Sequence, residues 1–197
     1  MTVEVFASHG TTERRRELAD RLLTELLAAE EAPESVLVGA RAFIHVLVHE
    51  PAVWVTGGPD APRYLVRITV PGSWNGKEFG DHIIPKVTEI VASFEDDPGR
   101  LRREPHCVVQ IVGLREYGVG TLGRATTSTE ITRLMTENYR RSGEQVEAPA
   151  GSVVDPVCGM LVELETATLT LEHDGTTYAF CAPSCRKVFA EERAIPV

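Results

Sequence analysis

Residues 65–70 read Leu-Val-Arg-Ile-Thr-Val, an alternation of apolar and polar side chains that predicts a half-buried β-strand. A turn rich in proline and glycine follows at residues 71–73. Apolar residues then recur at helical spacing over residues 79–94, and a second strand is expected over residues 107–114. Because a helix connects the two strands, they are expected to run parallel in one sheet.

The same order of elements occurs earlier in the chain. Residues 3–7 alternate like a strand, and an apolar helical stripe begins near Thr12 and ends near Pro33. Residues 36–55 are rich in β-branched side chains and predict the second strand of this half. The apolar positions of the two halves match at an offset of about 60 residues, which indicates an internal duplication. The sequence therefore predicts an α+β fold: two fused βαβ units that form a four-stranded sheet with both helices on one face.

A third helix and a small second domain are expected after this sheet. The capping-box spacing of residues 127–130 predicts a helix that stops at Gly143. Residues 144–153 have the composition of a linker, so we expect a large domain over residues 1–143 and a small one over residues 154–197. A domain of about forty residues has too small a core to fold securely alone, so it is expected to need a staple such as a metal ion.

The composition excludes several classes of protein. The chain has 197 residues and a formal net charge of -9, which argues against binding to nucleic acid, because a nucleic-acid binder normally shows a basic face. The sequence has no apolar run long enough for a transmembrane helix and no signal-peptide pattern at its start. We therefore expect a soluble cytoplasmic protein without membrane insertion. In a reducing compartment, clustered cysteines favour a metal or redox site over disulfides.

Three of the four cysteines fall in the last forty residues, at Cys158, Cys181 and Cys185. A predicted hairpin over residues 169–180 brings the chain back to Cys181. Pro183 predicts the first turn of a helix, which places Cys185 one turn beyond Cys181, where the helix dipole favours a thiolate. Three thiolates that converge on one point suit a soft or borderline transition metal ion.

The identity of the metal and its fourth ligand stay open at this point. Three thiolates alone suit copper(I), whereas a fourth donor favours zinc. The candidate fourth ligands are His173, Asp155 and the His106–Cys107 pair. The plainer alternatives are a purely structural zinc ion and a set of buried, inert cysteines.

The stretches Asp155-Pro-Val-Cys-Gly-Met160 and Tyr178-Ala-Phe-Cys-Ala-Pro-Ser-Cys185 closely resemble the YHS domain and the related TRASH heavy-metal-binding motif, over about residues 153–192. The resemblance implies a small metal-binding knuckle of the kind found beside heavy-metal transport, sensing and resistance proteins, and in some oxygenase subunits. The metal of this family is not uniform, so the resemblance does not identify it. Ala182 stands where many relatives carry serine, which affects no expected ligand.

The two fused βαβ units, with glycine-containing turns after their second strands, resemble a tandem member of the tautomerase superfamily over residues 1 to about 125. The resemblance implies a homotrimer whose sheets face inward. The chemistry of that family depends on an N-terminal proline as general base, but this chain carries Thr2 there, so the base is missing. Two weak catalytic candidates are Thr2, through its α-amine if Met1 is removed, and Arg41, which we expect on the second strand as a partner for a carboxylate.

The leading hypothesis is a soluble metal-binding protein that carries copper(I) or zinc on a trimeric, tautomerase-like scaffold. Its role would be metal homeostasis, sequestration or transfer to a protein partner. The alternatives are a tautomerase-like or metal-dependent enzyme and a zinc-stapled protein-interaction module. The missing proline favours a binding protein over an enzyme.

Overall fold

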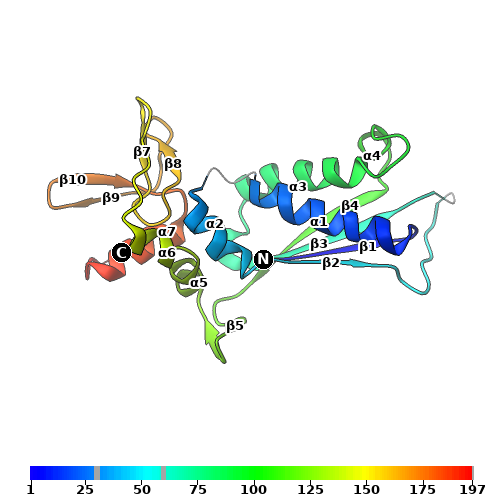
Figure 1. Cartoon of the computed structure of the whole chain (residues 1–197), viewed down its shortest axis with the longest axis horizontal. Helices are drawn as coiled ribbons and strands as arrows, with labels where there is room; N and C mark the ends of the chain where they lie inside the picture. Colours follow the sequence, from blue (N-terminus) through cyan, green and yellow to red (C-terminus); the bar gives the residue numbers. More distant parts are fainter. Residues whose placement is uncertain (29–31, 59–60, 197) are drawn as a thin grey trace. The chain divides into compact units, whose positions relative to one another are not determined.

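The computed structural model describes residues 1–28, 32–58 and 61–196 (Figure 1). The chain divides into two compact units, one made of Met1–Ala29 with Ile44–Leu114 and the other of Glu30–Phe43 with Arg115–Val197. This division follows packing within the chain, and the domain boundaries expected at residues 144–153 stay a prediction. Among the helices of the described residues, none is both long and apolar enough to cross a membrane.

The first unit contains a four-stranded sheet of order β2-β1-β3-β4. Strand β1 (Thr2–Ala7) is parallel to β2 (His45–His49), and β3 (Tyr64–Pro71) is parallel to β4 (Cys107–Leu114). The two halves join through the antiparallel pair of β1 and β3. The predicted α+β fold with two βαβ units in one sheet is therefore confirmed.

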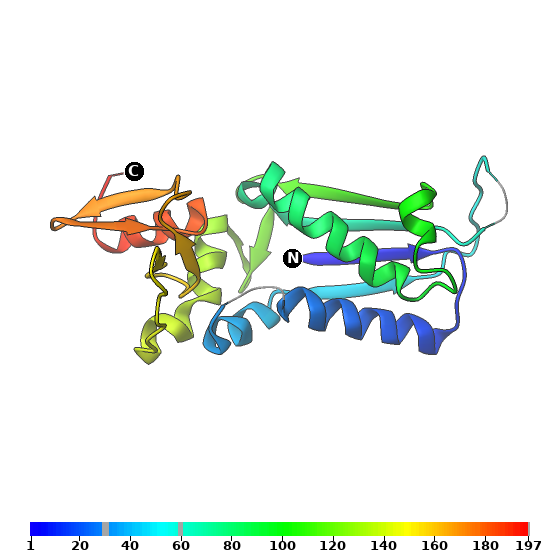
Figure 2. The same ribbon diagram turned by 90° about the horizontal axis from the view of Figure 1, so that it is seen from above.

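Both long helices of this unit cover the same face of the sheet, as Figure 2 shows for α1 (Thr12–Ala28) and α3 (Lys77–Ala92). Leu22 of α1 and Val87 of α3 are fully buried in one cluster with Val5 and Val66 of the central strands. The alternation along the strands sends these apolar side chains to the covered face. The short helices η1 (Gly72–Trp74) and α4 (Arg100–Arg103) flank α3.

In the described part of the first unit, no long helix covers the other face of the sheet. Phe6, Leu65 and Val108 lie side by side across β1, β3 and β4. Val108 is 48% exposed, and Leu47 on the edge strand β2 is 43% exposed. Phe6 and Leu65 are half-buried, so the row is partly exposed, and an apolar surface of this kind is one that another molecule can cover.

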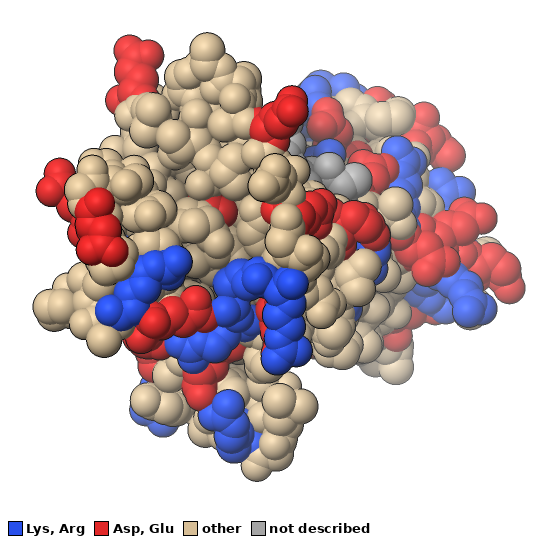
Figure 3. Space-filling view, turned by 60° about the vertical axis from the view of Figure 1, so that its left-hand side comes forward, with Lys and Arg blue, Asp and Glu red and all other residues tan. Residues whose placement is uncertain are grey.

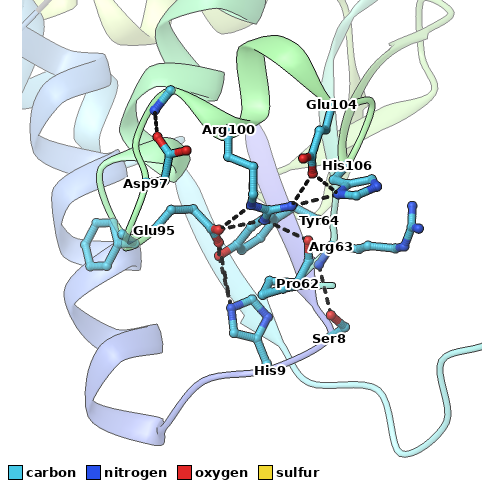
Figure 4. Close-up of polar contacts among 12 residues, drawn as sticks. Ser8, His9, Pro62, Arg63, Tyr64, Glu95, Asp97, Arg100, Glu104 and His106 are labelled. Atoms are coloured by element: carbon cyan, nitrogen blue, oxygen red, sulfur yellow. Dashed lines mark hydrogen bonds and ion pairs between the residues drawn. The ribbon is translucent and has the colours of Figure 1, made fainter. Parts of the chain in front are cut away.

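A buried polar network closes one end of this sheet (Figure 4). The carboxylate of Glu95 accepts a hydrogen bond from the Tyr64 hydroxyl at 2.5 Å and from the Arg100 guanidinium at 2.6 Å. Arg100 also donates to the carbonyl of Pro62 at 2.9 Å and lies 2.7 Å from Nδ1 of His106. Burial and the contact with Glu95 raise the pKa of Tyr64, which therefore stays neutral. The network fixes the starts of β3 and β4 against the end of α3.

The expected strand over residues 36–55 is wrong for its first part, because α2 (Glu34–Arg41) is a helix. Its buried residues are Val36 and Ala40, four positions apart on one helical face. Pro33 occupies the N-cap position of the helix. The β-branched valines suggested a strand, but the packing of this one face decides for a helix. Only His45–His49 forms the strand.

The second unit combines α2 with the part of the chain after Leu114. The capping box of Thr127 and Glu130 is present and begins α5 (Ser128–Met135). The expected single helix is interrupted at Thr136, and α6 (Glu137–Ser142) follows it. Helix α6 ends as predicted at Gly143, whose φ of 68° is left-handed. A hairpin of β5 (Val119–Thr121) and β6 (Arg124–Thr126) precedes these helices.

The C-terminal segment of the second unit has its own apolar cluster and a helical neighbour. Helix α7 (Pro183–Glu192) packs against α5, and Arg133 of α5 pairs with Glu191 of α7 at 2.5 Å. The apolar cluster contains Val157, Phe180, Val188 and Phe189. The segment is therefore held both by its own apolar cluster and by its packing on α5. On the face turned forward in Figure 3, basic and acidic side chains are intermixed.

Candidate metal centre

Four potential ligands converge in the second unit. Asp155, Cys158, Cys181 and Cys185 each offer one ligand atom, and these atoms all lie within 4.8 Å of one another. They come from three places in the chain: a tight loop, the end of a hairpin and the first turn of a helix. The expectation that the three thiols meet at one point therefore agrees with the geometry.

The first cysteine is presented by a short loop between two strands. Strands β7 (Ser152–Val154) and β8 (Leu161–Glu163) are antiparallel, and the loop between them starts at Asp155. The amide of Asp155 donates to the carbonyl of Met160 at 2.8 Å, and the amide of Gly159 donates to the carbonyl of Asp155 at 2.8 Å. These two bonds fix the backbone on both sides of Cys158.

The other two cysteines follow a hairpin, as predicted. Strands β9 (Thr170–His173) and β10 (Thr176–Ala179) are antiparallel, and the two turn residues Asp174 and Gly175 both have positive φ, which a type I′ turn requires. Cys181 follows β10, and Cys185 lies in the first turn of α7 behind Pro183. The hairpin thus returns the chain to the loop that carries Cys158.

The spacing of the sulfur atoms fits a single metal ion. The Sγ atoms of Cys158 and Cys181 are 3.4 Å apart, and those of Cys181 and Cys185 are 3.8 Å apart. A tetrahedral site with metal–sulfur bonds of about 2.3 Å requires sulfur atoms about 3.8 Å apart. The thiols therefore need little movement to bind one ion. Cys158 and Cys185 are buried, whereas Cys181 is exposed.

The thiols influence one another's ionisation. Hydrogen bonds from the Cys181 and Cys185 thiols hold the pKa of Cys158 at about 4, far below its ordinary value. The pKa values of Cys181 and Cys185 are raised, above all because both thiols donate to the Cys158 thiolate. A second anion at this distance is strongly disfavoured unless a cation compensates the charge. The donor set is therefore compatible with a metal ion.

Asp155 is completely buried beside the thiols. One carboxylate oxygen accepts the amide hydrogen of Val157 at 2.8 Å, and the other accepts that of Cys181 at 2.9 Å. Burial and the neighbouring Cys158 thiolate raise the pKa of Asp155 to about 6. The sequence named Asp155 only as one of three alternative ligands. Its link to the backbone of Cys181 depends on the folded hairpin and has no signal in the sequence.

The other candidate ligands lie elsewhere. His173 is next to the hairpin turn, with Nε2 3.4 Å from a carboxylate oxygen of Asp174, and its ring lies perpendicular to the ring of Phe189. It does not belong to the cluster found among the described residues. His106 and Cys107 belong to the first unit, where His106 contacts Arg100 and burial raises the pKa of Cys107 to about 11. The geometry therefore places Asp155, and not His173, beside the three thiols.

Of the two catalytic candidates, one begins a strand and the other ends a helix. Thr2 is the first residue of β1, paired with His45 and Thr69 in the sheet. Arg41 is the last residue of helix α2 and pairs with Glu34 at 2.7 Å, so its expected position on a strand is wrong. The two residues belong to different compact units.

Comparisons with known proteins agree with both parts of this description. Residues 153–194 match the family model of the YHS domain. Pt0534, crystallised after inactivation by 2-oxo-3-pentynoate, superposes with a TM-score of 0.52 at 16% identity, over 66% of this chain and 98% of its own. A fused 4-OT described as an asymmetric trimer has a TM-score of 0.50 at 19% identity, over 64% of this chain and 95% of its own.

Macrophage migration inhibitory factor from Oncomelania hupensis is also similar, with a TM-score of 0.50 at 10% identity, over 64% of this chain and 97% of its own. Among the curated proteins, none matches the chain in sequence. These low identities establish the fold and nothing about activity. The chain thus joins a tautomerase-like α+β fold to a C-terminal YHS domain.

Proposed function

We propose that this protein binds a transition metal ion through Cys158, Cys181 and Cys185 and serves in metal homeostasis, by sequestration or by transfer to a protein partner. The observation that carries the proposal is the convergence of three thiols from separate segments at sulfur spacings of 3.4 and 3.8 Å. Such spacing lets one ion reach all three sulfur atoms. The ion is cargo in this proposal, and the exposed Cys181 is the group from which a partner thiol displaces it.

Copper(I) and zinc are the ions that the donor set favours. Thiolates select soft and borderline ions, and three of them without a fourth protein donor suit copper(I), whereas zinc prefers four ligands. The carboxylate of Asp155 lies beside the thiols, but its two oxygens already accept backbone amides, so a zinc ion would take its fourth ligand from water or from a partner thiol. The two ions therefore differ in whether they need a fourth ligand from outside the protein.

Metal analysis of the purified protein tests this proposal. The double variant Cys181→Ser/Cys185→Ser is expected to lose the bound ion, because a hydroxyl is a far weaker ligand than a thiolate for these metals. The wild-type protein is expected to carry one ion per chain by mass spectrometry under native conditions. A Cys107→Ser variant serves as the control, since this cysteine lies in the first unit and is expected to leave the metal content unchanged. Equal metal content in the double variant and the wild type would refute the assignment.

We also propose that the first unit assembles into a homotrimer through the open face of its sheet. The apolar row formed by the half-buried Phe6 and Leu65 and the exposed Val108 supports this proposal, as does the likeness to a fused 4-OT trimer. Burying apolar surface contributes about 25 cal/mol for each Å². A trimer would then present three metal centres on one particle.

Light scattering tests the trimer. We expect the wild-type protein to show three times the mass of the 21.6 kDa chain, and a Val108→Asp variant to dissociate, because a charge in the covered face is costly. Val108 is half exposed in the single chain, so its replacement leaves the core intact. A monomeric wild-type protein would contradict the proposal.

A further inference from the structure

The carboxylate of Asp155 connects the two segments that carry the cysteines. Its two oxygens accept amide hydrogens from Val157, in the loop of Cys158, and from Cys181, after the second hairpin. Both bonds are short, at 2.8 and 2.9 Å, and the side chain has no exposed surface. A buried carboxylate is costly unless it is hydrogen-bonded, so this position is stable only while both amides face it. Asp155 therefore fixes the distance between the two cysteine-bearing segments.

These bonds join protein groups alone, so they do not require a metal ion to form. The carboxylate of Asp155 accepts the backbone amide of Cys181. The backbone amide of Asp155 donates to the carbonyl of Met160, and its carbonyl accepts the amide of Gly159, so these two bonds close the loop around Cys158. Each carboxylate oxygen already accepts one short hydrogen bond from a backbone amide, so both oxygens are engaged with the protein before an ion arrives. The hydrogen bonds of Asp155 thus hold together the two segments in which the Sγ atoms of Cys158 and Cys181 lie 3.4 Å apart.

We infer that Asp155 is a positioning residue: it assembles the three-thiol cluster before the ion binds and keeps the cluster in place after the ion leaves. This inference rests on the proposed metal binding. The apolar cluster around Val157, Phe180 and Phe189 and the packing of α7 on α5 add support that is independent of the ion. The segment therefore stays folded when the ion is released. Sequestration and transfer require this behaviour, whereas a purely structural zinc site unfolds when it loses its metal.

Amide hydrogen exchange of the wild-type protein tests the first part of the inference. After removal of metal with a chelator, the amides of Val157 and Cys181 are expected to stay protected, with exchange rates within about tenfold of those in the zinc-loaded protein. Protection that appears only after zinc is added would show that the ion assembles the site, and would overturn the role of Asp155. This measurement requires no variant and no knowledge of the native metal.

Two matched variants test the second part. Asp155→Asn keeps the shape of the side chain but turns one acceptor into a donor that faces an amide, so zinc affinity is expected to fall about 10- to 100-fold in competition with a chromophoric chelator. Asp174→Asn removes the same charge from the same domain at a position 88% exposed on the hairpin turn, and is expected to change the affinity less than about twofold. An unchanged affinity in Asp155→Asn would overturn the inference.

Cobalt(II) distinguishes a positioning residue from a ligand. At saturating cobalt, the absorption bands of Asp155→Asn are expected to match those of the wild type, because the same three thiolates surround the ion. A changed ligand-field spectrum would make Asp155 a ligand and overturn its positioning role. If Asp155→Asn does not fold, the exchange measurement on the wild type still decides. A wild-type protein that binds none of zinc, cobalt and copper(I) would overturn the proposed function, which is a different result from loss of amide protection.

Discussion

Replacement of Gly39 by alanine is expected to destabilise the second unit by roughly 3 kcal/mol, although alanine is the better helix former. A Cβ atom at Gly39 would lie 2.1 Å from the carbonyl oxygen of Met135 and 2.9 Å from its carbonyl carbon. Both are backbone atoms at the end of α5, so no side chain can rotate away to make room. Helix α2 can approach α5 this closely only because residue 39 has no side chain. The helices would have to move apart, and the packing between them would be lost.

The sign of the effect makes this prediction sharp. In an uncrowded helix, the change from glycine to alanine stabilises by about 1 kcal/mol. Gly80 in α3 provides the control, because a Cβ there meets only the side chain of Ile111 at an ordinary 3.7 Å. Gly80→Ala is therefore expected to raise the urea-unfolding midpoint slightly, and Gly39→Ala to lower it clearly. Far-UV circular dichroism follows both units, while the two tryptophans, Trp54 and Trp74, report on the first unit. An unchanged midpoint in Gly39→Ala would disprove the close helix contact.

Replacement of Gly159 by alanine is expected to damage the metal centre itself. Gly159 has a φ of +73°, and an added Cβ would lie 2.5 Å from the Pro33 ring and 2.7 Å from the ring of the buried Tyr139. The left-handed backbone alone costs about 1 kcal/mol for alanine, and crowding against two rings adds about 1 to 3 kcal/mol. Because Gly159 follows Cys158 directly, the loop is expected to shift its sulfur atom and weaken zinc binding at least tenfold.

The control for Gly159 has the same backbone and an open surrounding. Gly175 also has a φ of +73°, but nothing lies within 4 Å of an added Cβ. Gly175→Ala therefore reports the cost of the backbone conformation, and its difference from Gly159→Ala reports the crowding by Pro33 and Tyr139. Thermal unfolding and chelator competition measure both variants. Equal losses of stability in the two variants would show that the rings yield, and would contradict a tightly packed metal loop.

The contact of Gly159 with Pro33 has a consequence for the organisation of the protein. Pro33 precedes α2, which lies between α1 and β2 in the chain, so the first βαβ crossover supplies part of the packing around the metal loop. Tyr139 of α6 completes this packing. The YHS domain is thus packed against elements from outside its own sequence range. Despite its small size, the domain therefore does not need a bound metal ion in order to fold.

The sheet and the cysteine knuckle were predictable because their signals are local. Alternation along residues 65–70 depends only on which side chains face the helices, and the strand, helix, strand order then dictates parallel pairing. The type I′ turn at Asp174 and Gly175 is likewise a property of two neighbouring residues. The three cysteines could be assigned to one site because the sequence predicts each element that presents them: the turn at Cys158, the hairpin before Cys181 and the helix that starts at Pro183.

Helix α2 was missed because its environment overrides its composition. Valine-rich residues 36–38 favour a strand by propensity, but Val36 and Ala40 face the helices of the second unit and Gly39 touches the backbone of α5. Arg41 was consequently placed on a strand, and with it a carboxylate-binding role that the helix does not support. The break at Thr136 between α5 and α6 was missed for the same reason, since no proline or glycine marks it.

The sequence by itself determined the duplicated strand and helix pattern and the three thiols, because periodicity, turn chemistry and metal-ligand spacing act between residues that are close along the chain. Only the tertiary structure decided that Asp155 accepts hydrogen bonds from the amides of Val157 and Cys181 and that His173 lies outside the thiol cluster. It also decided that Pro33, at the start of α2, packs beside the loop that carries Cys158. Those features depend on groups that meet only after distant segments have packed. In the packed interior, a buried carboxylate must find hydrogen-bond donors, and close approach of two backbones requires a residue without a Cβ atom.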